Sequence, residues 1–203
     1  REVRLVKSQE REQRNNVLLP SVELRGSEEG KMKKIVGYAV KWDQRSNPIW
    51  GLFQEQFRKG AFLKSLQDQE VVATWQHRME EVLGRTPGTL TVVEDEIGLR
   101  YEIDPPTWAE RHIETIERGD VRGSSFIFRA KKEEWDETDP DMAVRTVIEA
   151  DLFEVCPVTI PAYPQSVASA RSAQEVFDSR SGSRLYENEL KLRMLDLMEM
   201  EGK

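Results

Sequence analysis

The sequence is poor in the residues that most often carry metal and redox chemistry. It has one cysteine, Cys156, and two histidines, His77 and His112. A single cysteine excludes an internal disulfide and fits a reducing compartment. Three such side chains are too few for most zinc sites built from protein ligands alone. We therefore expect no metal and no cofactor.

Long apolar runs and an excess of positive charge are also missing. The longest apolar runs are only a few residues, so no segment is predicted to span a membrane. The net charge of −7 argues against a general affinity for nucleic acid or for an anionic membrane surface. A hydrophobic content of 38% beside a charged content of 33% is typical of a globular domain with polar extensions.

Composition divides the chain into three parts. Residues 1–19 are dense in charge without a sustained apolar period, and we expect a helical or mobile arm rather than a packed element. Residues 20–171 carry the β-patterned segments and form the predicted folded domain. Residues 172–203 read as a polar linker followed by a helix, whose apolar stripe lies within 183–200.

Strand patterns dominate the folded domain. The expected fold class is mainly β with some α: a β-barrel or sandwich with peripheral helices. Directly after His77 we expect turn-forming sequence. The predicted strands lie within 33–42, 51–57, 71–77, the hairpin 88–104, 123–130 and 143–164, and the predicted helices within 60–67 and 107–120.

Two serines interrupt the most apolar strand, in "GSSFIF" at 123–128. Alternation places Ser124 on the same face as Phe126 and Phe128, and Ser125 on the other face. If the phenylalanines face the core, Ser125 lies on the outer face, where a substrate can reach it. The hydroxyls are then either satisfied by ordinary hydrogen bonds or one of them is a nucleophile, which needs an adjacent base.

Histidine is the expected base because its pKa lies near working pH. His77 ends the β-run "VVATWQH", whereas His112 lies inside a predicted helix among charged residues. From the pattern alone, either imidazole can instead be a hydrogen-bonded structural group. Cys156 offers a third reading, a thiol paired with His77, although a buried cysteine usually acts as a small apolar residue.

Three segments in order carry a resemblance to a known family. "WQHRMEEVLGRTPGTLTVVEDEIGLRYE", "ERGDVRGSSFIF" and "LFEVCPVTIPAYP" are similar to the prohead proteases of tailed bacteriophages, and the similarity extends over residues 33–171. The resemblance implies a serine endopeptidase and a fold like that of the herpesvirus assembly proteases, a β-barrel surrounded by helices. It also implies His77 as base and Ser125 as nucleophile. Ser124 stands where other members often carry a larger apolar residue, so it is kept in reserve, and the family commonly has serine at the position of Cys156.

The same resemblance implies a biological setting. The expected substrates are scaffold or an extension of the major capsid protein, together with the protease itself, inside the procapsid in the host cytoplasm. We expect neither nucleic acid nor a membrane as a partner, and self-association into a homo-oligomer stays open. The alternative function is a non-catalytic β-barrel that binds capsid protein as an assembly factor.

A serine–histidine pair works better with a third group that orients the imidazole. The candidates on the next long strand are Glu149, Asp151 and Glu154. Alternation sets Glu154 between Leu152 and Cys156, a partly apolar setting where a carboxylate needs a cationic partner. Glu154 also lies inside the family-like element "LFEVCPVT". We predict Glu154 as the third member, with Asp151 in reserve.

Overall fold

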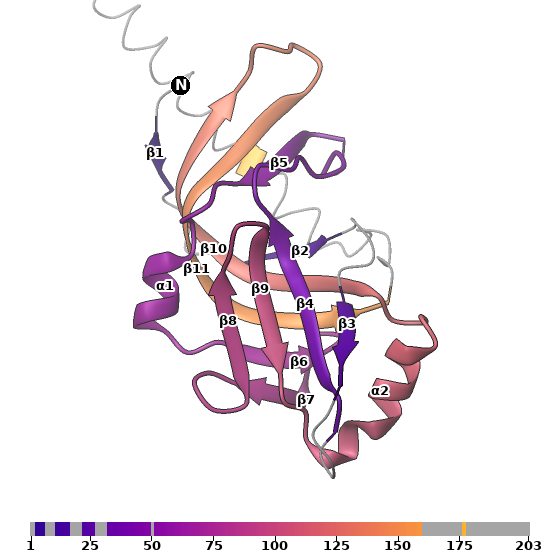
Figure 1. The fold of residues 1–203 in the computed structure, drawn as a ribbon. Coiled ribbons are helices and arrows are strands. Elements are labelled where there is room, and N and C mark those ends of the chain that lie inside the picture. Colours follow the sequence, from indigo (N-terminus) through magenta and orange to yellow (C-terminus); the bar gives the residue numbers. More distant parts are fainter. Residues whose placement is uncertain are drawn as a thin grey trace, which may run out of the picture.

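Two sheets form the folded part of the chain (Figure 1). The computed structural model describes residues 3–6, 11–16, 22–26, 32–49, 51–159 and 176–177. Within these ranges no helix is long and apolar enough to cross a membrane.

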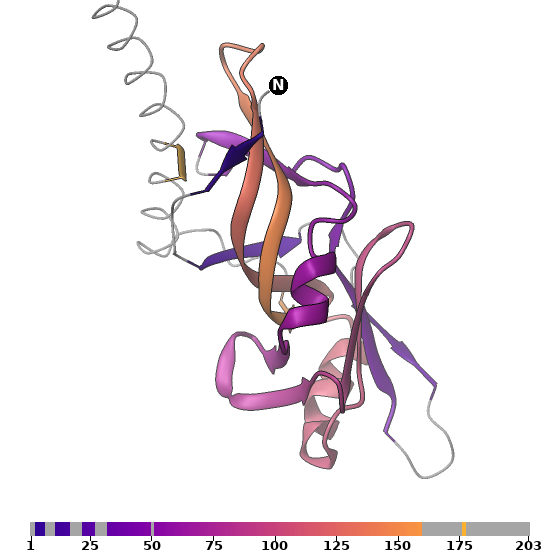
Figure 2. The ribbon, with the colours of Figure 1, turned by 90° about the vertical axis from the view of Figure 1, so that its left-hand side faces the viewer.

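The larger sheet has seven strands in the order β1-β10-β11-β6-β7, with β2 also paired to β10 and β5 to β11. Its centre is the long antiparallel hairpin of β10 and β11, which curls around the molecule and projects beyond it (Figures 1 and 2). The strands are β1 (Arg4–Leu5), β2 (Glu12–Asn16), β5 (Phe53–Phe57), β6 (Val72–Trp75), β7 (Arg78–Arg85), β10 (Gly123–Asp136) and β11 (Ala143–Val158).

The smaller sheet has four antiparallel strands in the order β3-β4-β9-β8. Two α-helices and a 3-10 turn flank the sheets. The strands are β3 (Val22–Arg25), β4 (Lys34–Lys41), β8 (Leu90–Glu94) and β9 (Gly98–Ile103); the helical segments are α1 (Leu63–Asp68), η1 (Thr107–Ala109) and α2 (Glu110–Glu117).

The apolar core lies between the two sheets and is rich in aromatic rings. Phe126 and Phe128 of β10 point into it and meet the ring of Phe57 edge-on, with centroids 5.4 and 5.0 Å away. All three side chains are at most 3% exposed. The alternation expected for β10 is therefore correct where it places the phenylalanines inside.

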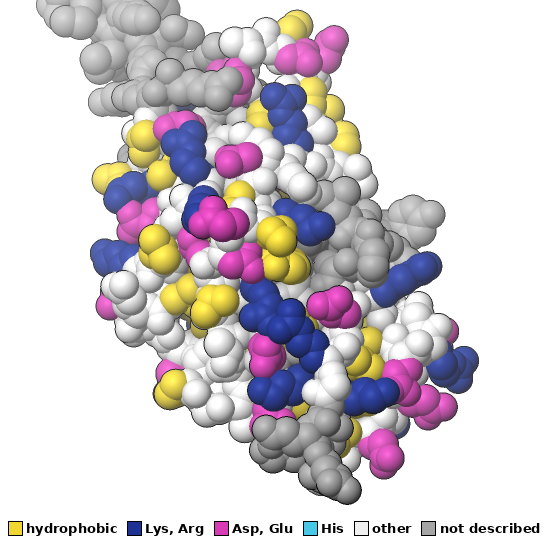
Figure 3. Space-filling view, in the orientation of Figure 1, with side chains coloured by type: hydrophobic (Ala, Val, Ile, Leu, Met, Phe, Trp, Pro, Cys, Tyr) yellow, Lys and Arg dark blue, Asp and Glu magenta, His cyan; other side chains and the backbone are white. Residues whose placement is uncertain are grey.

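The expected mainly β class is confirmed, and the large sheet curls into a half-barrel. The implied ring of surrounding helices is not what the described residues show, since α1 and α2 are short and lie at separate places beside the sheets (Figure 1). A likeness to the herpesvirus assembly proteases stays a prediction. The outer face of the smaller sheet carries interspersed acidic and basic side chains (Figure 3), as in the pair of Lys34 with Glu102.

The first arm is not helical where it is described: Glu12–Asn16 forms β2 and pairs with β10, because the ladder supplies backbone partners that local sequence does not show. The turn-forming sequence predicted directly after His77 is instead strand β7, which begins at Arg78. The predicted helix within 183–200 lies outside the described residues, and the domain boundaries stay predictions.

Candidate active site

His77 lies on a tight turn that joins β6 to β7. Gln76 and His77 both have positive φ angles, 55° and 59°. Two-residue hairpin turns require this left-handed conformation, which residues other than glycine adopt at a conformational cost. The turn is tied to the end of β11, because the Gln76 N–H donates to the Pro157 carbonyl at 3.2 Å and the Thr159 N–H donates to the Gln76 side chain at 3.3 Å. These contacts hold the imidazole over β11.

The turn brings His77 to Ser125 of β10. The His77 Nε2 atom lies 2.6 Å from the Ser125 Oγ atom, although the two residues are 48 positions apart. This is the distance of a strong hydrogen bond between a nucleophile and its base. The structure therefore brings together the two residues that the sequence analysis chose as base and nucleophile.

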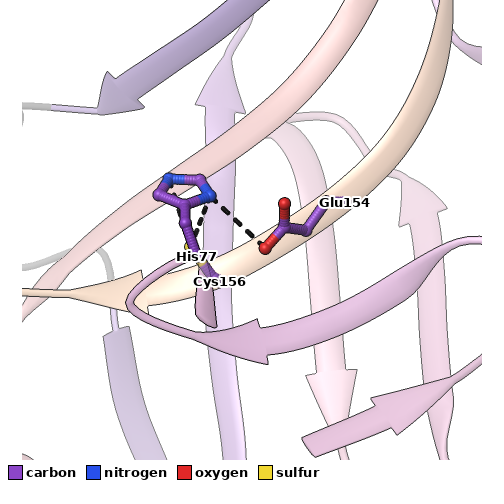
Figure 4. Close-up of side chains that lie close together, drawn as sticks. All are labelled: His77, Glu154 and Cys156. Carbon is purple, nitrogen blue, oxygen red and sulfur yellow. Dashed lines mark hydrogen bonds and ion pairs between the residues drawn. The ribbon is translucent and has the colours of Figure 1, made fainter. Parts of the chain in front are cut away.

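Glu154 of β11 approaches the other ring nitrogen. Its Oε1 atom lies 3.3 Å from His77 Nδ1, and Figure 4 shows the carboxylate turned towards the ring. The Thr74 hydroxyl donates to the same Oε1 atom. Glu154 is 1% exposed, and its Oε2 atom has no hydrogen-bond partner among the described residues. A buried charge with so few partners is stabilised by a cation, which a protonated imidazole supplies.

A β-bulge in β11 decides where Glu154 points. Ile127 pairs with Glu154 but Phe128 pairs with Leu152, so Phe153 is the extra residue. Leu152 consequently joins the apolar core, while Glu154 lies on the opposite face, the one that holds Ser125. The expected grouping of Glu154 with Leu152 is wrong, because simple alternation ignores the bulge.

The reserve candidates have other partners. Ser124 is buried, and its hydroxyl lies 2.8 Å from the Tyr101 hydroxyl. Asp151 binds Arg129 at 2.7 Å and Lys131 at 2.9 Å. Burial alone would raise the pKa of Asp151, but hydrogen bonds from these two cations hold that pKa below its usual value. None of these contacts reaches His77.

The second histidine is part of the packing between α2 and the sheet. His112 stacks on Trp75 with ring centroids 4.1 Å apart, and its Nε2 atom lies 3.0 Å from Glu81 Oε2. Burial lowers the pKa of His112, and the nearby Glu81 carboxylate only partly offsets this effect. These contacts match the structural alternative considered for this residue.

Cys156 lies beside the imidazole but remains a thiol. Its Sγ atom is 3.5 Å from both ring nitrogens of His77 (Figure 4). Burial, and then the charge of Glu154, raise the pKa of Cys156 well above its usual value. Because the thiolate is the reactive form, this environment disfavours a thiol nucleophile.

The same three side chains also meet the distance requirement of a metal site. The ligand atoms of His77, Glu154 and Cys156 lie within 4.8 Å of one another. Imidazole, carboxylate and sulfur are zinc ligands. An ion would take one ring nitrogen of His77: at Nε2 it would displace the Ser125 contact, and at Nδ1 it would use the nitrogen that Glu154 approaches.

Ser125 is not on an open surface, contrary to expectation. It is 0% exposed, because β2 pairs with β10 along Ser124–Phe128. The Ser125 hydroxyl donates to the backbone carbonyl of Arg14 at 2.9 Å. The sequence did not predict strand β2, and no motif singled out Thr74. The available signal for Thr74 was its place three residues before His77 on the same β-run.

Comparison with known proteins gives one match. The family model described as caudovirus prohead serine protease matches residues 20–179. No curated protein and no solved structure matches the chain. The matched range covers most of the sequence and includes His77, Ser125 and Glu154, but it begins after β2.

Proposed function

We propose that this chain, which belongs to the caudovirus prohead serine protease family, cleaves the scaffold or a capsid-protein extension, and itself, during procapsid maturation. The observation that carries the proposal is the 2.6 Å contact between His77 Nε2 and Ser125 Oγ. The family indicates a serine protease that acts in the prohead. The identity of the substrates and self-cleavage are our inference.

The geometry supports acyl transfer through a serine ester. His77 Nε2 takes the hydroxyl proton as Ser125 Oγ attacks the peptide carbonyl, and the imidazolium then gives a proton to the leaving amine. Water, deprotonated by the same nitrogen, hydrolyses the ester and regenerates the serine. Glu154 holds the ring from the Nδ1 side and stabilises the imidazolium, while the Thr74 hydroxyl holds the carboxylate.

A second function is a non-catalytic assembly factor that binds the capsid protein. The complete burial of Ser125 under β2 is the observation that favours it. In such a protein the contacts of the hydroxyl with the Arg14 carbonyl and with His77 would be structural only.

Active-site labelling separates the two functions. A fluorophosphonate should label the wild-type protein and the Ser124→Ala variant, but not Ser125→Ala. Co-expression with the capsid protein, followed by mass-spectrometric mapping of the fragments, should give products that Ser125→Ala does not make. Absence of both labelling and products would support the assembly factor.

A further inference from the structure

Strand β2, which covers Ser125, is held by its backbone as well as by its side chains. β2 runs antiparallel to β10, with Asn15 opposite Ser125 and Arg14 opposite Phe126. The Ser125 hydroxyl reaches the carbonyl of Arg14, which belongs to the peptide bond between Arg14 and Asn15. An extended segment added to a strand edge is a general mode of peptide recognition.

Glu55 of β5 receives the side chain of Arg14 in a two-pronged contact. Arg14 Nε lies 2.6 Å from Glu55 Oε1, and Arg14 Nη2 lies 3.1 Å from Glu55 Oε2. Glu55 is 2% exposed, so its carboxylate is shielded from water. A bidentate contact between guanidinium and carboxylate is geometrically specific, and lysine cannot reproduce it.

Arg145 of β11 receives the side chain of Glu12, which lies two residues before Arg14. Arg145 Nη1 and Nη2 donate to the two carboxylate oxygens of Glu12 at 2.6 and 3.0 Å. Arg145 is 0% exposed and is also bound by Glu55 and Glu133, each at 2.7 Å. Residues two apart on a strand share a face, so both charged side chains of β2 enter the same buried network.

The buried network of charges joins two parts: a receptor in the folded domain and a ligand, strand β2. Glu55, Glu133 and Arg145 lie within the range that matches the family, whereas Glu12 and Arg14 lie before it. Without β2, two Arg145 donors and the Glu55 carboxylate would lose these partners, a loss that costs free energy unless other groups replace them. An incoming segment that replaces both partners restores these contacts.

We propose that β2 occupies the place of the substrate, and that the enzyme cleaves extended segments after an arginine that follows a glutamate by two residues. The proposal rests on the proposed function and adds its sequence preference. Glu55 selects the arginine, and Arg145 selects the glutamate. Cleavage breaks the C–N bond after the arginine and consumes one water, leaving a carboxylate on the arginine and an amine on the next residue.

While it is docked, β2 also keeps His77 and Ser125 in an unreactive arrangement. A serine hydroxyl has one hydrogen, and the contact to the Arg14 carbonyl uses it, so the hydroxyl does not donate to His77. Weakening β2 in the full chain, by Arg14→Gln, should therefore raise the rate at which a fluorophosphonate labels Ser125. An unchanged or lower rate in this variant would overturn the placement of β2 in the substrate position.

The sequence preference is tested with an internally quenched peptide, EQRNNVLL, which has the sequence of residues 12–19. The enzyme is the full chain that carries Arg14→Gln. Cleavage should follow the arginine. Replacing that arginine with glutamine should lower kcat/KM by about 10- to 100-fold, and replacing the glutamate with glutamine should lower it by a smaller factor. Replacing the middle glutamine with alanine is the control and should change little, since Gln13 is exposed in β2.

A receptor variant separates recognition from folding. Adding Glu55→Gln to the enzyme should bring the ratio of kcat/KM for the arginine and glutamine peptides close to one, whereas a folding defect lowers both values together. Glu134→Gln removes another buried carboxylate, one bound to Arg58, and should keep the ratio. An enzyme that labels at Ser125 but shows no preference for arginine overturns this inference alone. An enzyme that neither labels nor cleaves overturns the proposed function and this inference with it.

Discussion

The Glu154 carboxylate stands 3.3 Å from His77 Nδ1, on the side of the ring that does not face Ser125. The distance exceeds that of a strong hydrogen bond, and catalytic hydrogen bonds commonly tighten only when substrate is bound. We therefore propose that Glu154 acts on the imidazolium rather than on the substrate.

The paired roles of His77 and Ser125 predict strong non-additivity. Ser125→Ala and His77→Ala should each lower processing of capsid protein by at least about 10⁴-fold, and the double variant should be no worse than either, because the two groups act as a unit. Circular dichroism should show folded protein in each case. Near-normal processing by Ser125→Ala together with an inactive Ser124→Ala would move the nucleophile by one residue.

Removing the charge of Glu154 should slow turnover without unfolding the protein. Glu154→Gln cannot stabilise an imidazolium as a carboxylate does, so we expect a loss of kcat of up to about 10⁴-fold. Labelling of Ser125 should persist, because the nucleophile stays in place. Asp151→Asn is the matched control and should retain activity. Wild-type turnover in Glu154→Gln would instead make Asp151 the residue to test.

The thiol of Cys156 should be dispensable for catalysis. Burial and the charge of Glu154 raise its pKa, so the native protein should react slowly with a thiol reagent at neutral pH and rapidly once denatured. Cys156→Ser should keep at least about a tenth of the wild-type activity, since the hydroxyl fills a similar place. Loss of activity in Cys156→Ser with retained labelling of Ser125→Ala would indicate a cysteine nucleophile.

His112 should make stability fall on acidification. Burial lowers its pKa in the folded protein, whereas the unfolded chain has the ordinary value of about 6.5. The unfolded state therefore binds the proton first, so stability is full above about pH 6.5 and declines as the pH falls towards the folded pKa. His112→Gln should show a smaller drop in Tm between pH 7.5 and 5.5, even if its Tm is lower throughout. An equal drop in both proteins would contradict the assignment.

The segment from about residue 172 onward should be cut by the protease itself, more slowly than the peptide EQRNNVLL, because none of its arginines follows a glutamate by two residues. "SAQEVFDSRSGSR" is polar and suits a linker, which favours access by a protease. Intact mass after incubation should decrease for the active protein and stay constant for Ser125→Ala. Equal trimming of both proteins would point to a contaminating protease.

Local sequence was enough to predict much of the fold. The period-two alternation of β10 placed Phe126 and Phe128 inside and Ser125 opposite them, because the direction of a strand side chain is a local property. The scarcity of histidine reduced the search for a base to His77 and His112. The similarity to the prohead proteases then selected between them, and the structure brings His77 to Ser125.

The tertiary structure decided what depends on partners distant in sequence. The bulge at Phe153 turns Glu154 onto the face that holds Ser125, and it is visible only when β11 is paired with β10. The first segment of the chain reads as a charged arm by itself, yet it becomes a strand because Arg145 and Glu55 offer its charges buried counterions. Charge and polarity are properties of a residue, but whether a charge is buried and paired depends on which distant strands meet around it.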